Sequence, residues 1–159
     1  MTGQPVRVVV AEDNDAFRET LELLLGLNGA IEVVGSVGDG EAAVEACVAL
    51  RPQVVVMDYR LPVLDGVQAT AAIHLACPGV AVVALTAEAS PREIDALLAA
   101  GAVACLSKDE RLETILDAIA AAAAAAGPRR AGLARQRGQG PALGAATALR
   151  AQSEPLLEG

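Results

Sequence analysis

Hydrophobic residues in the first 106 positions gather into five short runs. The runs are Val6–Ala11, Ile31–Val37, Val54–Met57, Val80–Leu85 and Ala102–Leu106. Most of them are continuous rather than alternating in polarity, which is typical of strands that are buried on both faces of a parallel sheet. We therefore expect five strands in one parallel sheet.

The segments between these runs have the spacing of amphipathic helices. Apolar residues within Phe17–Leu25 fall on one helical face, and we expect this helix to stop at Asn28-Gly29. Ser90-Pro91-Arg92-Glu93 predicts another helix start, because it combines a capping box with proline at the first helical position. An apolar stripe that begins at Leu112 predicts the last helix. This alternation of strand and helix predicts a doubly wound α/β fold with right-handed crossovers.

The periodic pattern ends after Gly127-Pro128. Residues 127–159 consist mainly of Ala, Gly, Arg, Pro and Gln, and too few large apolar side chains are present to stabilise a fold. We therefore expect a folded domain at residues 1–126 and a disordered tail at residues 127–159. The charge divides at the same place, since residues 1–126 carry 7 basic and 18 acidic side chains, and the tail carries five arginines and two glutamates.

The composition argues against several classes of function. Phe17 and Tyr59 are the only aromatic residues, so stacking of single-stranded nucleic acid is disfavoured. An acidic domain repels DNA and favours divalent cations and basic partners. Cys47, Cys77 and Cys105 are widely spaced and odd in number, which favours small buried hydrophobes over a disulfide or zinc site.

One uncharged stretch has the length of a membrane span but not its composition. Residues 66–87 lack Asp, Glu, Lys and Arg, yet Pro78-Gly79 divides them into two elements. The N-terminus has no basic region followed by an apolar core, as a signal peptide would. We expect a cytoplasmic protein that does not insert into a membrane.

Polar residues follow four of the apolar runs, where the strands are expected to end. Glu12 and Asp13 follow the first run, Asp58 the third, Thr86 the fourth and Lys108 the fifth. In doubly wound sheets the ligand lies beyond the carboxyl ends of the strands. Taken singly, each residue could be a helix cap or a solvated surface group. Taken together, Asp13 and Asp58 would be crowded like charges, and a hard cation such as Mg²⁺ would neutralise them.

This set of side chains suits phosphoryl transfer to a carboxylate. A carboxylate can act as a nucleophile and form an aspartyl phosphate, and the transfer depends mainly on alignment and charge neutralisation. Mg²⁺ on the acidic cluster would neutralise one side of the phosphoryl group, the Lys108 ammonium a second side, and the Thr86 hydroxyl would donate to a third oxygen. The residues therefore predict a phosphoacceptor site centred on Asp58.

Four segments resemble the signatures of response-regulator receiver domains, which act in two-component signalling. They are Val8–Asn14, Met57–Gly66, Ala84–Ala87 and Ser107–Asp109. They occur in the family's order and spacing, and the resemblance covers residues 5–126. Val33–Gly35, Asp39–Ala42 and the Lys-Asp pair at 108–109 resemble the NarL/LuxR-type subfamily. The resemblance implies a flavodoxin-like receiver fold with a five-stranded parallel sheet in the order 2-1-3-4-5.

The resemblance also implies a mechanism. A sensor histidine kinase would phosphorylate Asp58, and Mg²⁺ would be bound by Asp13, Asp58 and the main-chain carbonyl of Arg60. Glu12 would help to bind the metal directly or through water. Such a domain catalyses its own phosphorylation and dephosphorylation and is not an enzyme with an external substrate.

In the family, phosphorylation pulls the residue that corresponds to Thr86 inward and changes the surface of the fourth helix, fifth strand and fifth helix. A partner protein would bind this surface. The family usually has Tyr or Phe three residues before the conserved lysine, where this chain has Cys105, so Cys105 is expected to modulate the switch in place of the aromatic ring. Arg60 and Glu88, two positions after Asp58 and Thr86, are expected to modulate access of water to the acyl phosphate.

Three functions are compatible with the sequence. The first is a single-domain response regulator that switches a partner, since the tail is too short for a helix-turn-helix domain. The second is a DNA-binding transcription regulator whose output domain is lost or truncated, and the third is a receiver that acts without phosphorylation. A homodimer is compatible with each of them. His74 is expected to be a surface residue of the third helix and not a phosphodonor.

Overall fold

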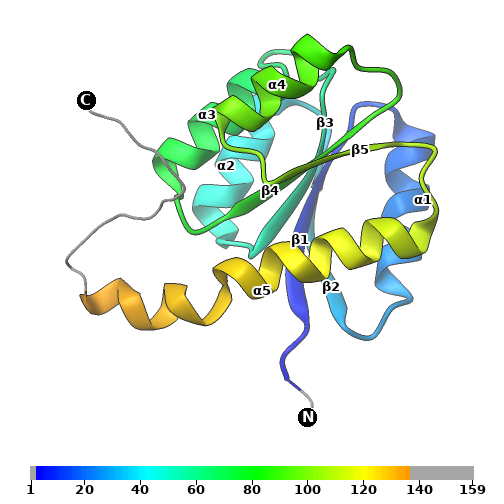
Figure 1. The fold of residues 1–159 in the computed structure, drawn as a ribbon. Coiled ribbons are helices and arrows are strands. Elements are labelled where there is room, and N and C mark those ends of the chain that lie inside the picture. Colours follow the sequence, from blue (N-terminus) through cyan, green and yellow to red (C-terminus); the bar gives the residue numbers. More distant parts are fainter. Residues whose placement is uncertain (1–2, 137–159) are drawn as a thin grey trace. The chain divides into compact units, whose positions relative to one another are not determined.

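The computed structural model describes residues 3–136 of the 159-residue chain, with side chains described as far as residue 125. The strands are β1 (Val6–Ala11), β2 (Ile31–Val37), β3 (Val54–Asp58), β4 (Ala81–Thr86) and β5 (Ala104–Ser107). The helices are α1 (Asp15–Gly26), α2 (Gly40–Leu50), α3 (Gly66–Ala76), α4 (Pro91–Ala100) and α5 (Leu112–Gln136). Strand and helix alternate five times, as the hydrophobic pattern predicts (Figure 1).

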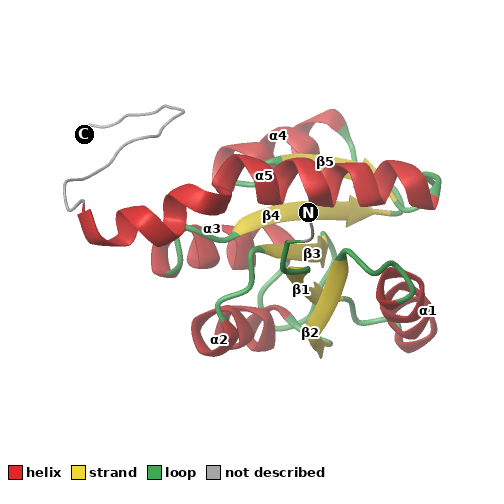
Figure 2. Ribbon diagram, turned by 90° about the horizontal axis from the view of Figure 1, so that it is seen from below, coloured by secondary structure: helices red, strands yellow, loops and turns green. Residues whose placement is uncertain are grey.

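The five strands form one parallel sheet in the order β2-β1-β3-β4-β5. This confirms the predicted doubly wound α/β fold and its strand order. Every residue of β3 and β4 is buried, because helices cover both faces of the sheet (Figure 2), and this explains the continuous apolar runs. Ala11 pairs with Met57 and Asp58 pairs with Leu85, so the carboxyl ends of the central strands lie side by side.

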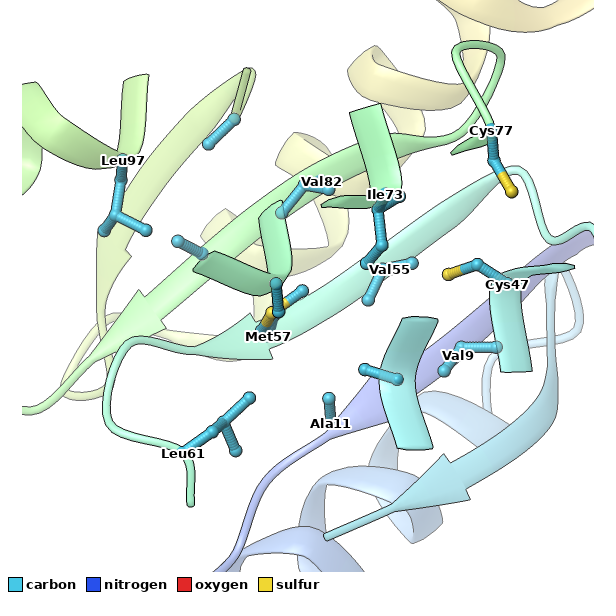
Figure 3. Close-up of a cluster of buried hydrophobic side chains, with 14 residues drawn as sticks. Val9, Ala11, Cys47, Val55, Met57, Leu61, Ile73, Cys77, Val82 and Leu97 are labelled. Atoms are coloured by element: carbon cyan, nitrogen blue, oxygen red, sulfur yellow. The ribbon is translucent and has the colours of Figure 1, made fainter. Parts of the chain in front are cut away.

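Alternate residues of each strand enter two separate hydrophobic cores. Val9, Val55 and Val82 belong to the core beneath α2, α3 and α4, together with Ile73 and Leu97. Figure 3 shows the side chains of this core. The opposite core combines their sequence neighbours on the strands with side chains from α1 and α5. Its members on β1, α1 and α5 are Val8, Val10, Leu21, Leu25, Ile115, Ile119, Ala122 and Ala123.

Side-chain caps define where the helices begin. The Asn14 side chain accepts a hydrogen bond from the Phe17 N–H at the start of α1. Ser90 and Glu93 form the predicted capping box at α4, with Pro91 in the first turn. Helix α1 ends at Gly26, slightly before the predicted stop at Asn28-Gly29, and boundaries of this kind commonly differ by one or two residues.

The last helix is longer than the sequence pattern suggests. The first compact unit ends at Ala126, yet α5 continues to Gln136. The Ala, Leu, Arg and Gln residues that flank Gly127-Pro128 are strong helix formers, and this propensity accounts for the difference at residues 127–136. The remainder of the expected tail, residues 137–159, lies outside the described residues. Within residues 3–136, no helix is long and apolar enough to cross a membrane.

Candidate functional site

Three carboxylates meet at the carboxyl edge of the sheet. Glu12 follows β1 and Asp58 ends β3, and only 2% and 7% of their surfaces are exposed, whereas Asp13 is exposed. Ligand oxygens of Glu12, Asp13 and Asp58 all lie within 4.8 Å of one another. The Glu12 carboxylate also accepts a 2.9 Å hydrogen bond from the Asn14 N–H, which fixes its orientation. The structure thus assembles the acidic cluster that the strand ends predict.

Lys108 provides the positive charge within this cluster. Its Nζ lies 2.7 Å from Glu12 Oε1 and 3.3 Å from Asp58 Oδ2, and it lies 4.7 Å from the centre of the Phe17 ring. The Lys108 N–H donates a 2.8 Å hydrogen bond to the carbonyl of Thr86. Pairing of β4 with β5 therefore brings the lysine to the carboxylates.

Thr86 is the last residue of β4 and is 5% exposed. It pairs in register with Ser107 of β5, next to Lys108 in the chain. Asp58 pairs with Leu85 of the same strand. The β-sheet register therefore places Thr86, Lys108 and Asp58 at one edge, as predicted from the order of the runs.

Burial and charge change the acidity of the groups in this cluster. Burial, followed by the negative charge of Glu12, raises the pKa of Asp58 above its usual value, although Lys108 and a hydrogen bond from the Arg60 N–H oppose the increase. Burial acts to lower the pKa of Lys108, but hydrogen bonding and charge attraction from Glu12 and Asp58 outweigh it, so that pKa is raised. In this cluster three carboxylates face the single ammonium of Lys108. The excess of negative charge would attract a further cation.

The donor chemistry of the site fits Mg²⁺. Three carboxylates offer oxygen ligands within a small volume, and Mg²⁺ prefers oxygen ligands and keeps several waters. Exposure of Asp13 leaves one side of the cluster open to those waters. Neither sulfur nor imidazole belongs to this group of potential ligands, so a hard cation suits it better than a soft one.

The loop after Asp58 bends tightly toward α3. The Gly66 N–H donates a 2.7 Å hydrogen bond to the Tyr59 carbonyl. A Cβ atom built on Gly66 would lie 2.7 Å from Tyr59 Cα and 2.8 Å from the Asp58 carbonyl oxygen. Glycine is therefore required at position 66 because the two backbone segments approach so closely.

The three residues expected to modulate the site occupy different environments. Arg60 and Glu88 are exposed, and the Arg60 guanidinium lies 5.5 Å from the centre of the Tyr59 ring. Cys105 is half-buried on β5, pairs with Ala84 and packs against the core beneath α2, α3 and α4. Burial raises the pKa of the Cys105 thiol, which disfavours the reactive thiolate form.

Other residues considered from the sequence lie away from the site. His74 is exposed on α3, as predicted, and its side chain lies next to Gly101. Cys47 and Cys77 are buried in a hydrophobic core, also as predicted. Sequence reasoning assigned Phe17 only to the apolar face of a helix and missed the contact of its ring with Lys108. No local signal identifies that contact, because the lysine belongs to a distant element.

Receiver domains are defined by a five-stranded doubly wound sheet with carboxylates after β1 and at the end of β3, a hydroxyl at the end of β4 and a lysine after β5. Residues 8–120 match the family described as response regulator receiver domain. The chain belongs to this family, and it contains the receiver domain of a two-component response regulator.

Individual relatives agree with this assignment. A probable transcriptional regulatory protein NarL from Mycobacterium tuberculosis is 37% identical over 73% of this chain and 54% of its own length. A protein-glutamate methylesterase/protein-glutamine glutaminase from Pseudomonas aeruginosa is 40% identical over 65% of this chain and 28% of its own length. This chain thus spans about half or less of these relatives.

Solved structures show the same fold. The signal receiver domain of the putative response regulator NarL from Mycobacterium tuberculosis has a TM-score of 0.70 and 35% identity, and the match covers 74% of this chain and 98% of that one. The response regulator domain of Thermotoga maritima CheB has a TM-score of 0.69 and 28% identity, with coverage of 76% and 98%.

Proposed function

We propose that Asp58 accepts a phosphoryl group from a sensor histidine kinase in a Mg²⁺-dependent reaction. The observation that carries this proposal is the position of Asp58, which is buried beside Glu12 and Asp13 and lies 3.3 Å from Lys108. An Asp58 oxygen attacks phosphorus as the bond from phosphorus to the histidine nitrogen breaks. The product is an acyl phosphate on Asp58 and a free histidine on the kinase.

Each neighbouring group has a distinct role in this proposal. Glu12, Asp13, Asp58 and the Arg60 main-chain carbonyl would hold Mg²⁺, which when bound neutralises charge on the phosphoryl oxygens. The Lys108 ammonium pairs with a phosphoryl oxygen on the side of β5.

Thr86 completes the proposed site from β4. Its hydroxyl donates to a phosphoryl oxygen and moves inward with it. The exposed side chains of Arg60 and Glu88 modulate hydrolysis of the acyl phosphate. The domain catalyses only its own phosphorylation and dephosphorylation, without turnover of an external substrate.

A partner protein reads the phosphorylated state at the surface formed by α4, β5 and α5. Cys105 lies on β5, where the family usually has an aromatic ring, so the inward movement of Thr86 proceeds against a smaller side chain. The acidic charge of residues 1–126 disfavours direct contact between this domain and DNA.

Regulation of transcription is a second candidate function, and the similarity to a NarL-type transcriptional regulatory protein favours it. Measuring the binding of the full chain to DNA across a range of salt concentrations tests it. Sequence-specific binding would support this function, whereas binding that disappears with added salt and shows no sequence preference would indicate charge attraction alone.

Phosphorylation can be tested with Mg²⁺ and a small acyl phosphate as donor, followed by mass spectrometry of the intact protein. We expect the wild type to gain one phosphoryl group and Asp58→Asn to gain none, and chelation of Mg²⁺ to prevent the reaction. Asp65→Asn is the matched control, because Asp65 caps α3 and asparagine caps a helix equally well. Equal labelling of the wild type and Asp58→Asn would disprove the proposal.

A further inference from the structure

The loop between β3 and α3 contains a strained residue. Val63 has a φ of 71°, a region that β-branched residues rarely adopt. The Leu64 N–H donates a 2.8 Å hydrogen bond to the Pro62 carbonyl, which closes a three-residue turn around Val63. The Val63 side chain is 70% exposed, so its own packing does not hold the turn in this conformation. Strain of this kind persists only where surrounding structure imposes it.

The first residue of α2 contacts this turn through a hydrogen bond. N–H groups in the first turn of a helix have no partner within the helix. The Gly40 N–H is buried and donates a 3.1 Å hydrogen bond to the Pro62 carbonyl, while Asp39 caps the Ala42 N–H at 2.7 Å. The Pro62 carbonyl thus accepts one hydrogen bond from Leu64 in its own turn and a second from Gly40, which is distant in sequence.

Gly40 also leaves no space between α2 and this turn. A Cβ atom built on Gly40 would clash with the Leu64 carbonyl oxygen and would lie 2.7 Å from Leu64 C and Cβ. The φ of Gly40 is not in the left-handed region, since Gly101 alone among the described glycines has a positive φ. Glycine is therefore needed at position 40 for close contact and not for its backbone conformation.

The turn is close in sequence to groups that belong to the phosphoacceptor site. Arg60 precedes Pro62 by two residues, and its backbone acts directly on Asp58, where it favours the ionised carboxylate and so opposes the rise of the Asp58 pKa. At the other end of the loop, the 2.7 Å hydrogen bond from the Gly66 N–H to the Tyr59 carbonyl holds the chain against the end of β3. Because that end is tied, we expect a side chain at position 40 that displaces the turn to move the backbone at Arg60 as well.

We propose that Gly40 is a positioning residue for the metal and phosphoacceptor site. By fixing the turn at Pro62–Leu64, it sets the position of the Arg60 backbone relative to Asp58. This inference rests on the proposed function, because it concerns the geometry of the same site. Gly40 is not among the residues proposed to bind the metal or the phosphoryl group.

The affinity for Mg²⁺ tests this role without depending on phosphorylation. Isothermal titration calorimetry of the full chain should show Gly40→Ala weakening the Kd for Mg²⁺ by about 10-fold, the typical effect of disturbing groups that orient metal ligands. Gly38→Ala, in the loop that precedes α2, is the matched control, because its Cβ would meet only the Arg18 guanidinium at 3.4 Å. We expect that control to stay within about 2-fold of the wild type.

Folding must be measured beside affinity, because a residue with a purely structural role would lower the urea midpoint and leave the Kd of the folded protein unchanged. A folded Gly40→Ala protein with the wild-type Kd therefore overturns the inference. A wild type that binds no Mg²⁺ overturns the proposed metal site instead, and the two failures are distinguishable.

If Gly40→Ala does not fold, the same comparison is made in a Val63→Gly background. Glycine adopts a positive φ without strain, so the turn can shift to accommodate a side chain at position 40. We expect the double variant to fold and to bind Mg²⁺ about 10-fold more weakly than Val63→Gly alone. Equal affinity of these two proteins would overturn the inference.

Discussion

Lys108 Nζ lies closer to Glu12 Oε1, at 2.7 Å, than to Asp58 Oδ2, at 3.3 Å. The lysine is thus shared between a carboxylate after β1 and the carboxylate at the end of β3. A phosphoryl group on Asp58 would compete with Glu12 for this ammonium. Glu12 can remain in place when the lysine moves, because its other carboxylate oxygen accepts the Asn14 N–H.

Replacing Lys108 with methionine should destabilise the metal-free protein. The change leaves the buried carboxylates of Glu12 and Asp58 without their cation, and we expect a loss of roughly 1–3 kcal/mol in the free energy of unfolding. Mg²⁺ should restore part of this loss and bind more tightly than to the wild type, since no lysine competes with it. Urea unfolding with and without Mg²⁺ measures both effects. Lys108→Arg, which retains the charge, is the control, and equal stability of all three metal-free proteins would contradict the expectation.

Replacing Asp58 with asparagine should have the opposite effect on metal-free stability. Burial and the charge of Glu12 both disfavour the ionised form of Asp58, so removal of that charge should stabilise the protein at neutral pH by about 1 kcal/mol. Mg²⁺ should then stabilise the wild type more than the variant. Thermal unfolding with added Mg²⁺ or a chelator measures the difference, and Asp65→Asn serves again as control. A metal-free Asp58→Asn protein that is less stable than the wild type would refute this account.

Stability should decline at alkaline pH through Cys47. Burial, followed by the neighbouring Cys77, raises the pKa of Cys47 from 9.0 to about 12. Above about pH 9 the unfolded chain loses this thiol proton, whereas the folded protein retains it. The contribution of Cys47 to the free energy of unfolding is therefore fully present below about pH 9 and is lost as the pH rises toward 12. The slope for one proton is about 1.4 kcal/mol per pH unit. Comparing urea unfolding of the wild type and Cys47→Ala from pH 8 to 11 isolates this contribution, and identical slopes would rule it out.

Replacing Thr70 with valine should stabilise the protein. Thr70 lies on α3 and is 0% exposed, and its Oγ1 has no hydrogen-bond partner among the described residues. Valine keeps the shape and removes the buried hydroxyl, which should raise the free energy of unfolding by about 1 kcal/mol. Thr20→Val on α1 is the control, because Thr20 is exposed. Chemical denaturation measures the free energy of unfolding of each variant, and a loss of stability in Thr70→Val would contradict the prediction.

The hydrophobic pattern predicted the central strands almost to the residue. The run Val54–Met57 became β3 at Val54–Asp58, and the run Val80–Leu85 became β4 at Ala81–Thr86. Both strands are buried on two faces, so nearly all of their residues are apolar and the apolar run marks where each strand begins and ends. Helix ends were less predictable, because Gly127-Pro128 is locally unfavourable for a helix and α5 nevertheless continues to Gln136.

The sequence alone therefore determined the order of strands and helices and the polar residues at the strand ends, because hydrophobic periodicity and capping depend on neighbours in the chain. Only the tertiary structure decided which of those residues touch. The contact of Lys108 with Glu12 and the absence of space between Gly40 and Leu64 depend on how separate elements pack. Distances of that kind arise from sheet register and helix packing, which no local pattern encodes.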